Sequence, residues 1–357
     1  MNINQLELIN FRNHKKQKWS FSSGISIIIG RNAAGKTNLM EAIYLLSVGK
    51  SFRSGRDMQV ITFGEEIAKV KGEVGMDGDS KDLEIMITGG KVMGMKTPLK
   101  KYLINDVARR STDFAGTLKC VLFWPEDMEL VTDSPFSRRH YLDYVLIQTD
   151  GEYRRTQISY ERGLRQRNKL LEDIREGKAH EHQLLFWDQL LSKQGGYITR
   201  KRGEFIESTN GFKLPKLEER NVKYRLVYDK SVITQLRLEQ YRQAELGAGV
   251  TLIGPHRDNF IFQKEEGGEY MDLSSFGSRG EQRLAVLWLK LAELNFVKNS
   301  GGENPVLLLD DIFSELDRSR REIIFSIIGK QQSILTVTDR HMIPEKYYKG
   351  AKVVELK

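Results

Sequence analysis

Hydrophobic and polar residues follow several different periods along the chain, and each period predicts a kind of element. Residues 3–9 alternate between apolar and polar side chains, which is typical of a strand with one buried face. Residues 38–48 and 281–297 repeat their apolar positions at helical spacing and predict helices. Three further runs are continuously apolar, as in strands buried on both faces: residues 25–29, 306–309 and 333–337.

The middle of the chain changes character twice. Residues 67–107 combine short apolar stretches with glycine-containing turns and predict a β-meander, and residues 119–124 predict one more strand. Residues 137–205 contain no proline and mix charged and apolar side chains at helical spacing, so we predict a hairpin of helices there. Residues 222–228 alternate again and predict a strand.

This order of elements predicts an α/β fold whose sheet strands come from both ends of the chain. We expect a discontinuous head formed by residues 1–130 and 245–357, and a helical insert formed by residues 131–244. A chain of 357 residues is long enough for two such domains.

Between the first buried strand and the first helix lies the sequence G-R-N-A-A-G-K-T, which matches G-x-x-x-x-G-K-[ST]. Glycines at this spacing let successive backbone N–H groups point at phosphate oxygens, and the N-terminus of the following helix favours negative charge. Lys36 would reach the β- and γ-phosphates of a nucleotide, and the Thr37 hydroxyl would bind Mg²⁺. The predicted phosphate-binding residues are Gly30, Arg31, Asn32, Ala33, Ala34, Gly35, Lys36, Thr37 and Asn38.

The apolar strand at residues 306–309 ends in two adjacent acids, Asp310 and Asp311. A buried strand seldom ends in two carboxylates unless a cation lies beside them, and a phosphate-binding loop upstream supplies the reason for one. We predict that Asp310 contacts Mg²⁺ and that Asp311 polarises the attacking water as a general base.

A second glycine-containing segment, S-R-G-E-Q-R, lies directly before the helix predicted at 281–297. Its position between the phosphate loop and the carboxylate strand matches the order of ATPases of the ABC type. In those proteins a loop of this kind and the helix N-terminus behind it bind the γ-phosphate held by another protomer. We therefore predict that Ser278, Gly280 and Gln282 contact nucleotide across a homodimer.

Taken together, the ordered motifs resemble those of the RecF family, bacterial DNA repair and replication proteins related to SMC-type ATPases. The resemblance covers nearly the whole chain. It rests on Asn10–Asn13, Gly30–Asn38, Glu41–Tyr44, Lys50–Arg53, Pro125–Asp127, Arg138–Arg139, Gly254–Asp258, Gly280–Arg283 and Leu309–Asp317.

The resemblance implies an ABC-type P-loop ATPase head, with a mixed sheet and a β-meander subdomain, joined to a helical insert. It implies ATP and Mg²⁺ as cofactors and an ATP-dependent homodimer that closes on DNA. It further implies a weak, DNA-dependent ATPase of recombinational repair and replication, which supports loading of recombinase at gapped or single-stranded DNA and SOS induction. RecR and RecO are the implied partner proteins, and Arg12 is an implied nucleotide contact.

Three positions depart from the family pattern. Asn259 stands where a second acid usually follows G-P-H-R-D, and Glu281 stands where S-x-G-Q-Q has its first glutamine. The Glu281 change places a carboxylate near the predicted γ-phosphate contact. Phe52 stands where histidine is common in the family. Compared with ABC proteins more widely, Asp311 stands where many carry glutamate, and a shorter acid favours slow hydrolysis.

The composition indicates the cellular compartment of the protein and the charge of its partners. No apolar run approaches the ~20 residues that would span a membrane. A single cysteine, Cys120, excludes an internal disulfide and suits a reducing cytoplasm. The net charge of +8 favours anionic partners, and most of the excess lies in residues 1–72 and 138–204.

The basic residues in these two segments are the candidate DNA contacts, since binding to phosphates requires cations and no particular sequence. Lys15, Lys16 and Lys18 are expected in a loop beside the first strand, and the others follow the first helix or lie on the insert. Arg12 and Arg53 could touch either nucleotide or DNA. The full set is Lys15, Lys16, Lys18, Arg53, Arg56, Arg165, Arg167 and Lys169.

Two other functions stay open at this point. The nucleotide-binding subunit of an ABC transporter shares the phosphate loop and carboxylate strand, but the long charged insert argues against it. A stand-alone P-loop kinase would need no second glycine loop. Whether gapped, single-stranded or duplex DNA is preferred does not follow from the sequence.

Overall fold

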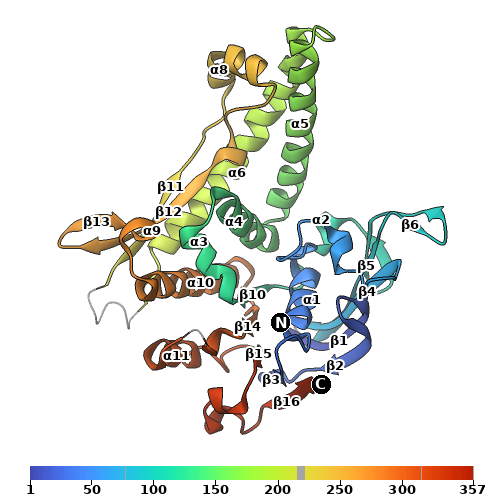
Figure 1. Cartoon of the computed structure of the whole chain (residues 1–357), viewed down its shortest axis with the longest axis vertical. Helices are drawn as coiled ribbons and strands as arrows, with labels where there is room; N and C mark the ends of the chain where they lie inside the picture. The colour runs from blue at the N-terminus through green and yellow to red at the C-terminus, as the bar shows by residue number, and fades with distance from the viewer. Residues whose placement is uncertain (77, 215–221, 315, 357) are drawn as a thin grey trace. The chain divides into compact units, whose positions relative to one another are not determined.

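The computed structural model describes residues 1–76, 78–214, 222–314 and 316–356 (Figure 1). The chain forms two compact units: Met1–Asp127 together with Glu293–Lys357, and Met128–Ala292. The second unit contains the whole predicted insert but extends 48 residues beyond its expected end at 244. The expected boundary falls inside a helix, α8 (Gln235–Ala248), which the sequence analysis did not anticipate.

A parallel five-stranded sheet forms one layer of the first unit. Its order is β10-β14-β15-β3-β16, and every neighbouring pair is parallel. The central strands are apolar on both faces, which confirms the strands predicted from the continuous apolar runs. The strands are β3 (Ile25–Gly30), β10 (Cys120–Phe123), β14 (Val306–Asp310), β15 (Ser333–Val337) and β16 (Lys352–Leu356).

An antiparallel six-stranded sheet, ordered β2-β1-β4-β5-β8-β9, makes up the second layer of this unit and contains the predicted meander. A small hairpin, β6 (Lys91–Val92) and β7 (Met95–Lys96), extends from it (Figure 1). The six strands are β1 (Asn2–Phe11), β2 (His14–Ser20), β4 (Ile67–Met76), β5 (Asp79–Thr88), β8 (Lys100–Ile104) and β9 (Val107–Arg109).

Strand β2 corrects one expectation. Lys15, Lys16 and Lys18 lie on this strand and not in a loop. Because β2 is the edge of the sheet, its charged side chains face solvent, and only His14 and Trp19 are buried. The sequence of β2 therefore contains too few apolar residues to show the alternation that is typical of a strand.

Helix α1 (Lys36–Val48) lies between the two sheets and contacts strands of both. Leu39, Ile43 and Leu46 are fully buried, and so is the carboxylate-bearing Glu41. The helix is therefore fixed on all sides, which holds its N-terminus and the loop before it in one place. The remaining helical segments of the unit are short: α2 (Ser111–Phe114), α11 (Arg318–Phe325) and the 3₁₀ turns Asp57–Val60, Ile312–Ser314, Arg340–Met342 and Glu345–Tyr347.

The second unit is built on the predicted helical hairpin, in which α5 and α6 pack side by side (Figure 1). A three-stranded antiparallel sheet, β11-β12-β13, accompanies it and leads through α9 to the long helix α10. The elements are α3 (Glu129–Thr132), α4 (Pro135–Thr149), α5 (Gly151–Arg175), α6 (Leu184–Asn210), β11 (Tyr224–Asp229), α8, β12 (Asn259–Glu266), β13 (Glu269–Asp272), α9 (Leu273–Phe276) and the part of α10 (Arg279–Gly301) up to Ala292.

Arg167 is an interior residue of this unit, so the expected DNA contact at this position is corrected. Its side chain is 0% exposed and lies between α5, α6 and α8. The guanidinium donates to Asp188 Oδ1 at 2.8 Å, to Glu245 Oε2 at 2.7 Å and to Thr251 Oγ1 at 2.8 Å. Its charge is compensated by two buried carboxylates, and it has no surface left for a phosphate.

The G-P-H-R-D segment is a second internal junction. Asp258 accepts from Arg202 at 3.0 Å, and Arg202 also binds Asp143 of α4 at 2.8 Å. His256 lies 2.8 Å from the Tyr160 hydroxyl and 3.1 Å from the Thr251 carbonyl, and burial lowers its pKa to about 4. His256 is thus a neutral structural residue that ties this segment to α5.

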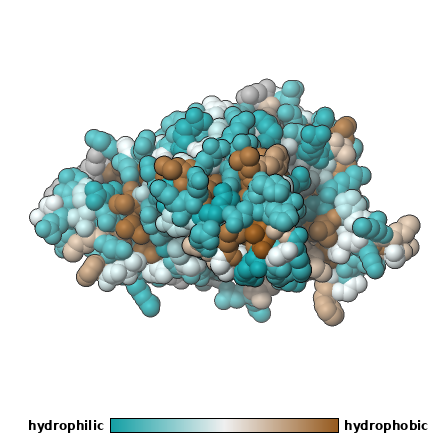
Figure 2. Space-filling model, turned by 90° about the horizontal axis from the view of Figure 1, so that it is seen from above, coloured by the Kyte–Doolittle hydropathy of each residue, from teal (hydrophilic) through white to brown (hydrophobic). Residues whose placement is uncertain are grey.

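Hydrophilic residues cover most of the face shown in Figure 2. On this face, apolar residues form small separate groups among hydrophilic ones. Within the described ranges, no helix is long and apolar enough to cross a bilayer.

Replacing Arg167 by alanine should destabilise the protein strongly, because Asp188 and Glu245 would stay buried without their cation. We expect a loss of about 3–5 kcal/mol in the free energy of unfolding. Arg162→Ala, which removes an exposed arginine of the same helix, should cost less than about 0.5 kcal/mol. Urea denaturation followed by circular dichroism measures both, and equal costs would show that the buried cluster is not a source of stability.

Candidate nucleotide-binding site

The predicted phosphate loop connects the carboxyl end of β3 to the first residue of α1. Its backbone is left-handed at two positions, Ala33 (φ 67°) and Gly35 (φ 97°). Glycine adopts this conformation without cost, whereas alanine does so only where the surroundings impose it. The Lys36 ammonium donates to the carbonyl oxygens of Gly30 at 2.8 Å and Arg31 at 3.2 Å, so this side chain lies along the inside of the loop.

The turn between β1 and β2 supports this loop from one side. His14 Nε2 lies 3.2 Å from the Gly35 carbonyl oxygen, and a Cβ on Gly35 would come within 2.6 Å of the imidazole. The Asn13 side chain accepts from Asn38 at 2.8 Å. Burial lowers the pKa of His14, which keeps the ring neutral beside a site built for anions. Glycine is therefore required at position 35 both for its backbone angle and for the space that His14 occupies.

The carboxylate strand ends beside the loop. Asp310 is 1% exposed and accepts from Thr336 Oγ1 of β15 at 2.6 Å, and the Thr37 side chain is among the nearby groups that favour its ionised form. Burial raises the pKa of Asp310, while Thr336, Thr37 and the Lys36 charge act in the opposite direction. A buried carboxylate whose charge is favoured by the loop threonine and lysine can serve as a ligand for a divalent cation.

Asp311 follows in a strained conformation. Its φ is 48°, which is uncommon for a residue with a side chain, and its N–H donates to Thr336 Oγ1 at 2.9 Å. Strain of this kind persists only where surrounding contacts impose it, and it is common at functional sites. The same threonine thus holds both acids of the strand end, one through its carboxylate and one through its backbone.

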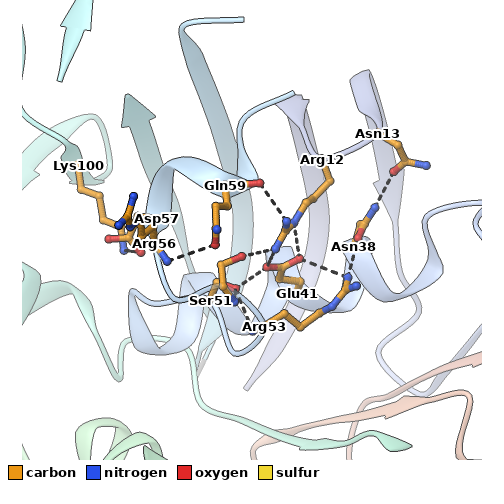
Figure 3. Close-up of polar contacts among 11 residues, drawn as sticks. Arg12, Asn13, Asn38, Glu41, Ser51, Arg53, Arg56, Asp57, Gln59 and Lys100 are labelled. Atoms are coloured by element: carbon orange, nitrogen blue, oxygen red, sulfur yellow. Dashed lines mark hydrogen bonds and ion pairs between the residues drawn. The ribbon is translucent and has the colours of Figure 1, made fainter. Parts of the chain in front are cut away.

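A network of polar side chains anchors α1 on the side facing the β1–β2 turn (Figure 3). Arg12 makes a two-pronged contact with the fully buried Glu41, at 2.9 Å and 2.6 Å, and Ser51 donates to the same carboxylate. Arg53 donates to Asn38 Oδ1 at 2.9 Å and keeps 37% of its side chain exposed. Arg12 therefore uses most of its donors inside the protein, whereas Arg53 beside Asn38 keeps an exposed face.

The candidate DNA contacts outside this network differ in exposure. Lys15, Lys16 and Lys18 are exposed in a row on β2, and Arg56 is exposed after α1. On the second unit, Arg165 is exposed, while Lys169 pairs with Asp173 at 2.9 Å. The lysines of β2 are the densest of these groups.

The second glycine loop belongs to the second unit and connects α9 to α10. Ser278 caps the helix, and the buried Gln282 donates to the carbonyl oxygens of Leu273 at 2.9 Å and Gly277 at 3.3 Å. Gln282 therefore shapes the loop from inside, and the exposed positions of the motif are Ser278 and Arg279. Glu315, in the motif that follows Asp311, lies outside the described residues.

Comparison with known proteins agrees with these motifs. The model of the RecF/RecN/SMC N-terminal domain matches residues 2–355. The DNA replication and repair protein RecF of Herpetosiphon aurantiacus is 36% identical over 95% of this chain and 94% of its own length. RecF of Moorella thermoacetica is 36% identical over 100% of this chain and 95% of its own length. The chain belongs to the RecF family.

Solved structures place the fold in the same family. A structure of the recombination mediator protein RecF-ATPrS superposes with a TM-score of 0.87 at 31% identity, covering 100% of this chain and 96% of that one. A structure of RecF-ATP gives 0.86 at 33% identity, covering 96% and 93%. An Smc head bound to the C-winged helix domain of ScpA gives 0.54 at 15% identity over 99% and 94%, a likeness of fold alone. The RecF-family chain therefore has the SMC/ABC ATPase head fold expected from its motifs.

Sequence reasoning missed two residues of this RecF-family site. Thr336 was treated as one more residue of a buried strand. A hydroxyl inside the apolar run S-I-L-T-V is nevertheless a sign of a buried polar contact. The strand register pairs Thr336 with Asp310. No role was assigned to His14 from the sequence. Its role depends on the packing of β2 beside the phosphate loop, which no local pattern reveals.

Asp310→Asn should stabilise the nucleotide-free protein at pH 8. The pKa of Asp310 is raised above its ordinary value of 3.8, so the folded state holds the proton more tightly than the unfolded state does. Stability is then lost as the pH rises through the window between these two pKa values. Asparagine avoids this loss at pH 8, and its advantage should shrink at about pH 4, close to the ordinary pKa of 3.8.

Thermal unfolding midpoints at the two pH values measure this effect, with the exposed Asp79→Asn as a control expected to change neither midpoint. A midpoint for Asp310→Asn that falls below wild type at pH 8 would contradict the assignment of a buried carboxylate with a raised pKa.

Proposed function

We propose that the chain is an ATP-switched DNA-binding ATPase of recombinational DNA repair and replication. The observation that carries the proposal is the buried carboxylate of Asp310, whose ionised form Thr37 and Lys36 of the phosphate loop favour. A backbone cradle, a lysine, a hydroxyl and a carboxylate are the four parts that P-loop ATPases use to hold a nucleoside triphosphate. The likeness to solved RecF structures described with ATP and ATPrS supports the choice of nucleotide.

Mg²⁺ fits the donors present. The Thr37 hydroxyl and the Asp310 carboxylate are hard oxygen ligands, and no larger cluster of acidic, histidine or cysteine side chains exists in the part of the chain that the structure describes. Mg²⁺ commonly takes only one or two protein ligands and completes its shell with phosphate and water. When bound, the ion neutralises the developing phosphate charge; Lys36 adds a second positive charge from inside the loop.

For hydrolysis, Asp311 is the proposed general base. Its backbone is fixed by Thr336, which leaves a short side chain to orient a water molecule. An aspartate reaches less far than a glutamate would, so we expect slow ATP hydrolysis. A slow rate suits a molecular switch better than an enzyme that hydrolyses ATP continuously. Arg12 and Arg53 are proposed to support the phosphate region, Arg12 through Glu41 and Arg53 through its exposed face.

Two copies are proposed to pair head to head when ATP is bound. Ser278, Gly280 and the loop that Gln282 shapes would meet the γ-phosphate held at Lys36 of the other copy. The contact between the γ-phosphate and the second copy exists only in the paired state, so loss of this phosphate on hydrolysis shifts the population back to monomers.

DNA is the proposed macromolecular ligand, and the exposed lysines of β2 are its first candidate contacts, with Arg53, Arg56, Arg165 and Lys169 as further ones. RecR and RecO are the proposed partner proteins, because the solved relative is described as part of the RecFOR pathway. Through them the chain would support loading of recombinase at gapped or single-stranded DNA and SOS induction.

Purified protein should be monomeric with ADP and should dimerise with Mg²⁺ and ATP in sedimentation velocity. Lys36→Met should abolish this dimerisation, and Asp311→Asn should prolong it while lowering hydrolysis by about 100-fold or more. A mass that does not depend on the nucleotide would contradict the proposed switch.

Replacing Lys15, Lys16 and Lys18 together by glutamine should weaken DNA binding. Each lost phosphate contact should reduce the slope of log affinity against log salt by about 0.9. A matched triple on the same unit, Lys91, Lys96 and Lys101 to glutamine, removes equal charge from exposed positions elsewhere. Fluorescence anisotropy on gapped and blunt DNA at two salt concentrations measures both; equal losses in the two triples would contradict a specific role for β2.

A further inference from the structure

Lys264 of β12 reaches the second glycine loop and holds Glu281, the residue at which this chain departs from the family pattern. Lys264 Nζ donates to Glu281 Oε1 at 2.5 Å. The other carboxylate oxygen, Oε2, accepts from the Ser278 N–H at 2.9 Å and from the Ser278 hydroxyl at 2.8 Å. Ser278 Oγ in turn accepts from the Glu281 N–H at 3.3 Å. These four contacts join a strand, a loop and the first turn of α10.

The arrangement around α10 is a capping box, in which the residues at the two ends of S-x-x-E satisfy each other's backbone donors. It makes the loop rigid before any partner arrives, but it also places a carboxylate at the end of the helix that is proposed to face a phosphate. The Lys264 contact and the Ser278 donors lower the pKa of Glu281 to about 2, so the carboxylate is charged at every physiological pH.

An unneutralised carboxylate at this place would repel the γ-phosphate of another copy. Lys264 lies only 19% exposed and Glu281 35%, so their charges are partly shielded from water and act over a short range. The only other acid recorded in contact with Lys264 within the described ranges is Glu266, at 3.5 Å and 59% exposed. The ammonium therefore has Glu281 as its closest partner.

We propose that Lys264 is a positioning residue for ATP-dependent pairing: it neutralises Glu281 and so allows the Ser278 loop to approach the triphosphate bound by a second copy. This inference rests on the proposed function, in which that loop engages nucleotide across the dimer. It explains how a chain with S-R-G-E-Q can pair as a chain with S-x-G-Q-Q would. Glutamine at 281 keeps an oxygen acceptor for Ser278 and brings no charge, so it needs no lysine.

The test compares four proteins: wild type, Lys264→Met, Glu281→Gln and the double variant. Sedimentation velocity with Mg²⁺ and ATP gives the dissociation constant of the dimer, and a fluorescent ATP analogue gives the nucleotide affinity of each monomer. Lys264→Met should weaken the dimer about 10-fold or more, which corresponds to ~1.4 kcal/mol or more. Glu281→Gln should pair at least as tightly as wild type, and adding it to Lys264→Met should restore pairing to within about 3-fold of Glu281→Gln alone, since no carboxylate remains to be neutralised.

The nucleotide affinity of the monomers should change less than about 2-fold in all four proteins, because the phosphate loop belongs to the other compact unit. Lys223→Met is the matched control: Lys223 lies beside the same small sheet, is 61% exposed, and pairs with Glu265 at 3.0 Å instead of with Glu281. It should leave the dimer unchanged, which separates the specific pair from a general loss of positive charge.

Three results would overturn the inference. The first is a Lys264→Met variant that pairs as tightly as wild type. The second is a double variant as weak as Lys264→Met, which would make the lysine merely structural. The third is a Lys223→Met variant that weakens pairing as much as Lys264→Met does. These results all require a wild type that dimerises with ATP. A wild type that stays monomeric would instead contradict the proposed function and this inference with it.

Discussion

The left-handed backbone of the phosphate loop is the constraint on which the site depends. A loop that turns its N–H groups inward must pass through positive φ at Ala33 and Gly35, and a free chain would not stay there. The loop is held by β3, which precedes it, and by α1, which follows it and is buried between two sheets. Asn13 and His14 contact it as well. Each support comes from a different part of the sequence, so the loop is a product of the whole first unit.

The parallel sheet explains why the acids lie where they do. In such a sheet the carboxyl ends of neighbouring strands meet at one edge, which brings Asp310 of β14, Thr336 of β15 and the start of the loop after β3 together. Burial makes the ionised form of Asp310 costly, and the cost is offset by hydroxyl donors and by the nearby lysine. A site of this kind is poised for a cation, because a cation removes the penalty that the apoprotein carries.

Much of this was predictable from the sequence where the signal is local. Continuous apolar runs predicted the central strands, and G-x-x-x-x-G-K-T between a strand and a helix predicted the loop. The failures have a common physical origin in tertiary contacts. Arg167 looked like a surface cation because its partners, Asp188 and Glu245, lie 21 and 78 residues away. Strand β2 was taken for a loop because an edge strand buries few side chains, and the boundary at 244 was misplaced because nothing in the sequence signals that α8 packs on α5 and α6.

The central claim is that Thr37 and Asp310 together hold Mg²⁺ on a nucleotide that Lys36 binds. Calorimetric titration of ATP into wild type and Thr37→Val, each with and without Mg²⁺, tests it most directly. The account predicts that Mg²⁺ tightens ATP binding to wild type and has little effect on Thr37→Val, whose isosteric side chain lacks the hydroxyl. An equal gain from Mg²⁺ in both proteins would contradict it.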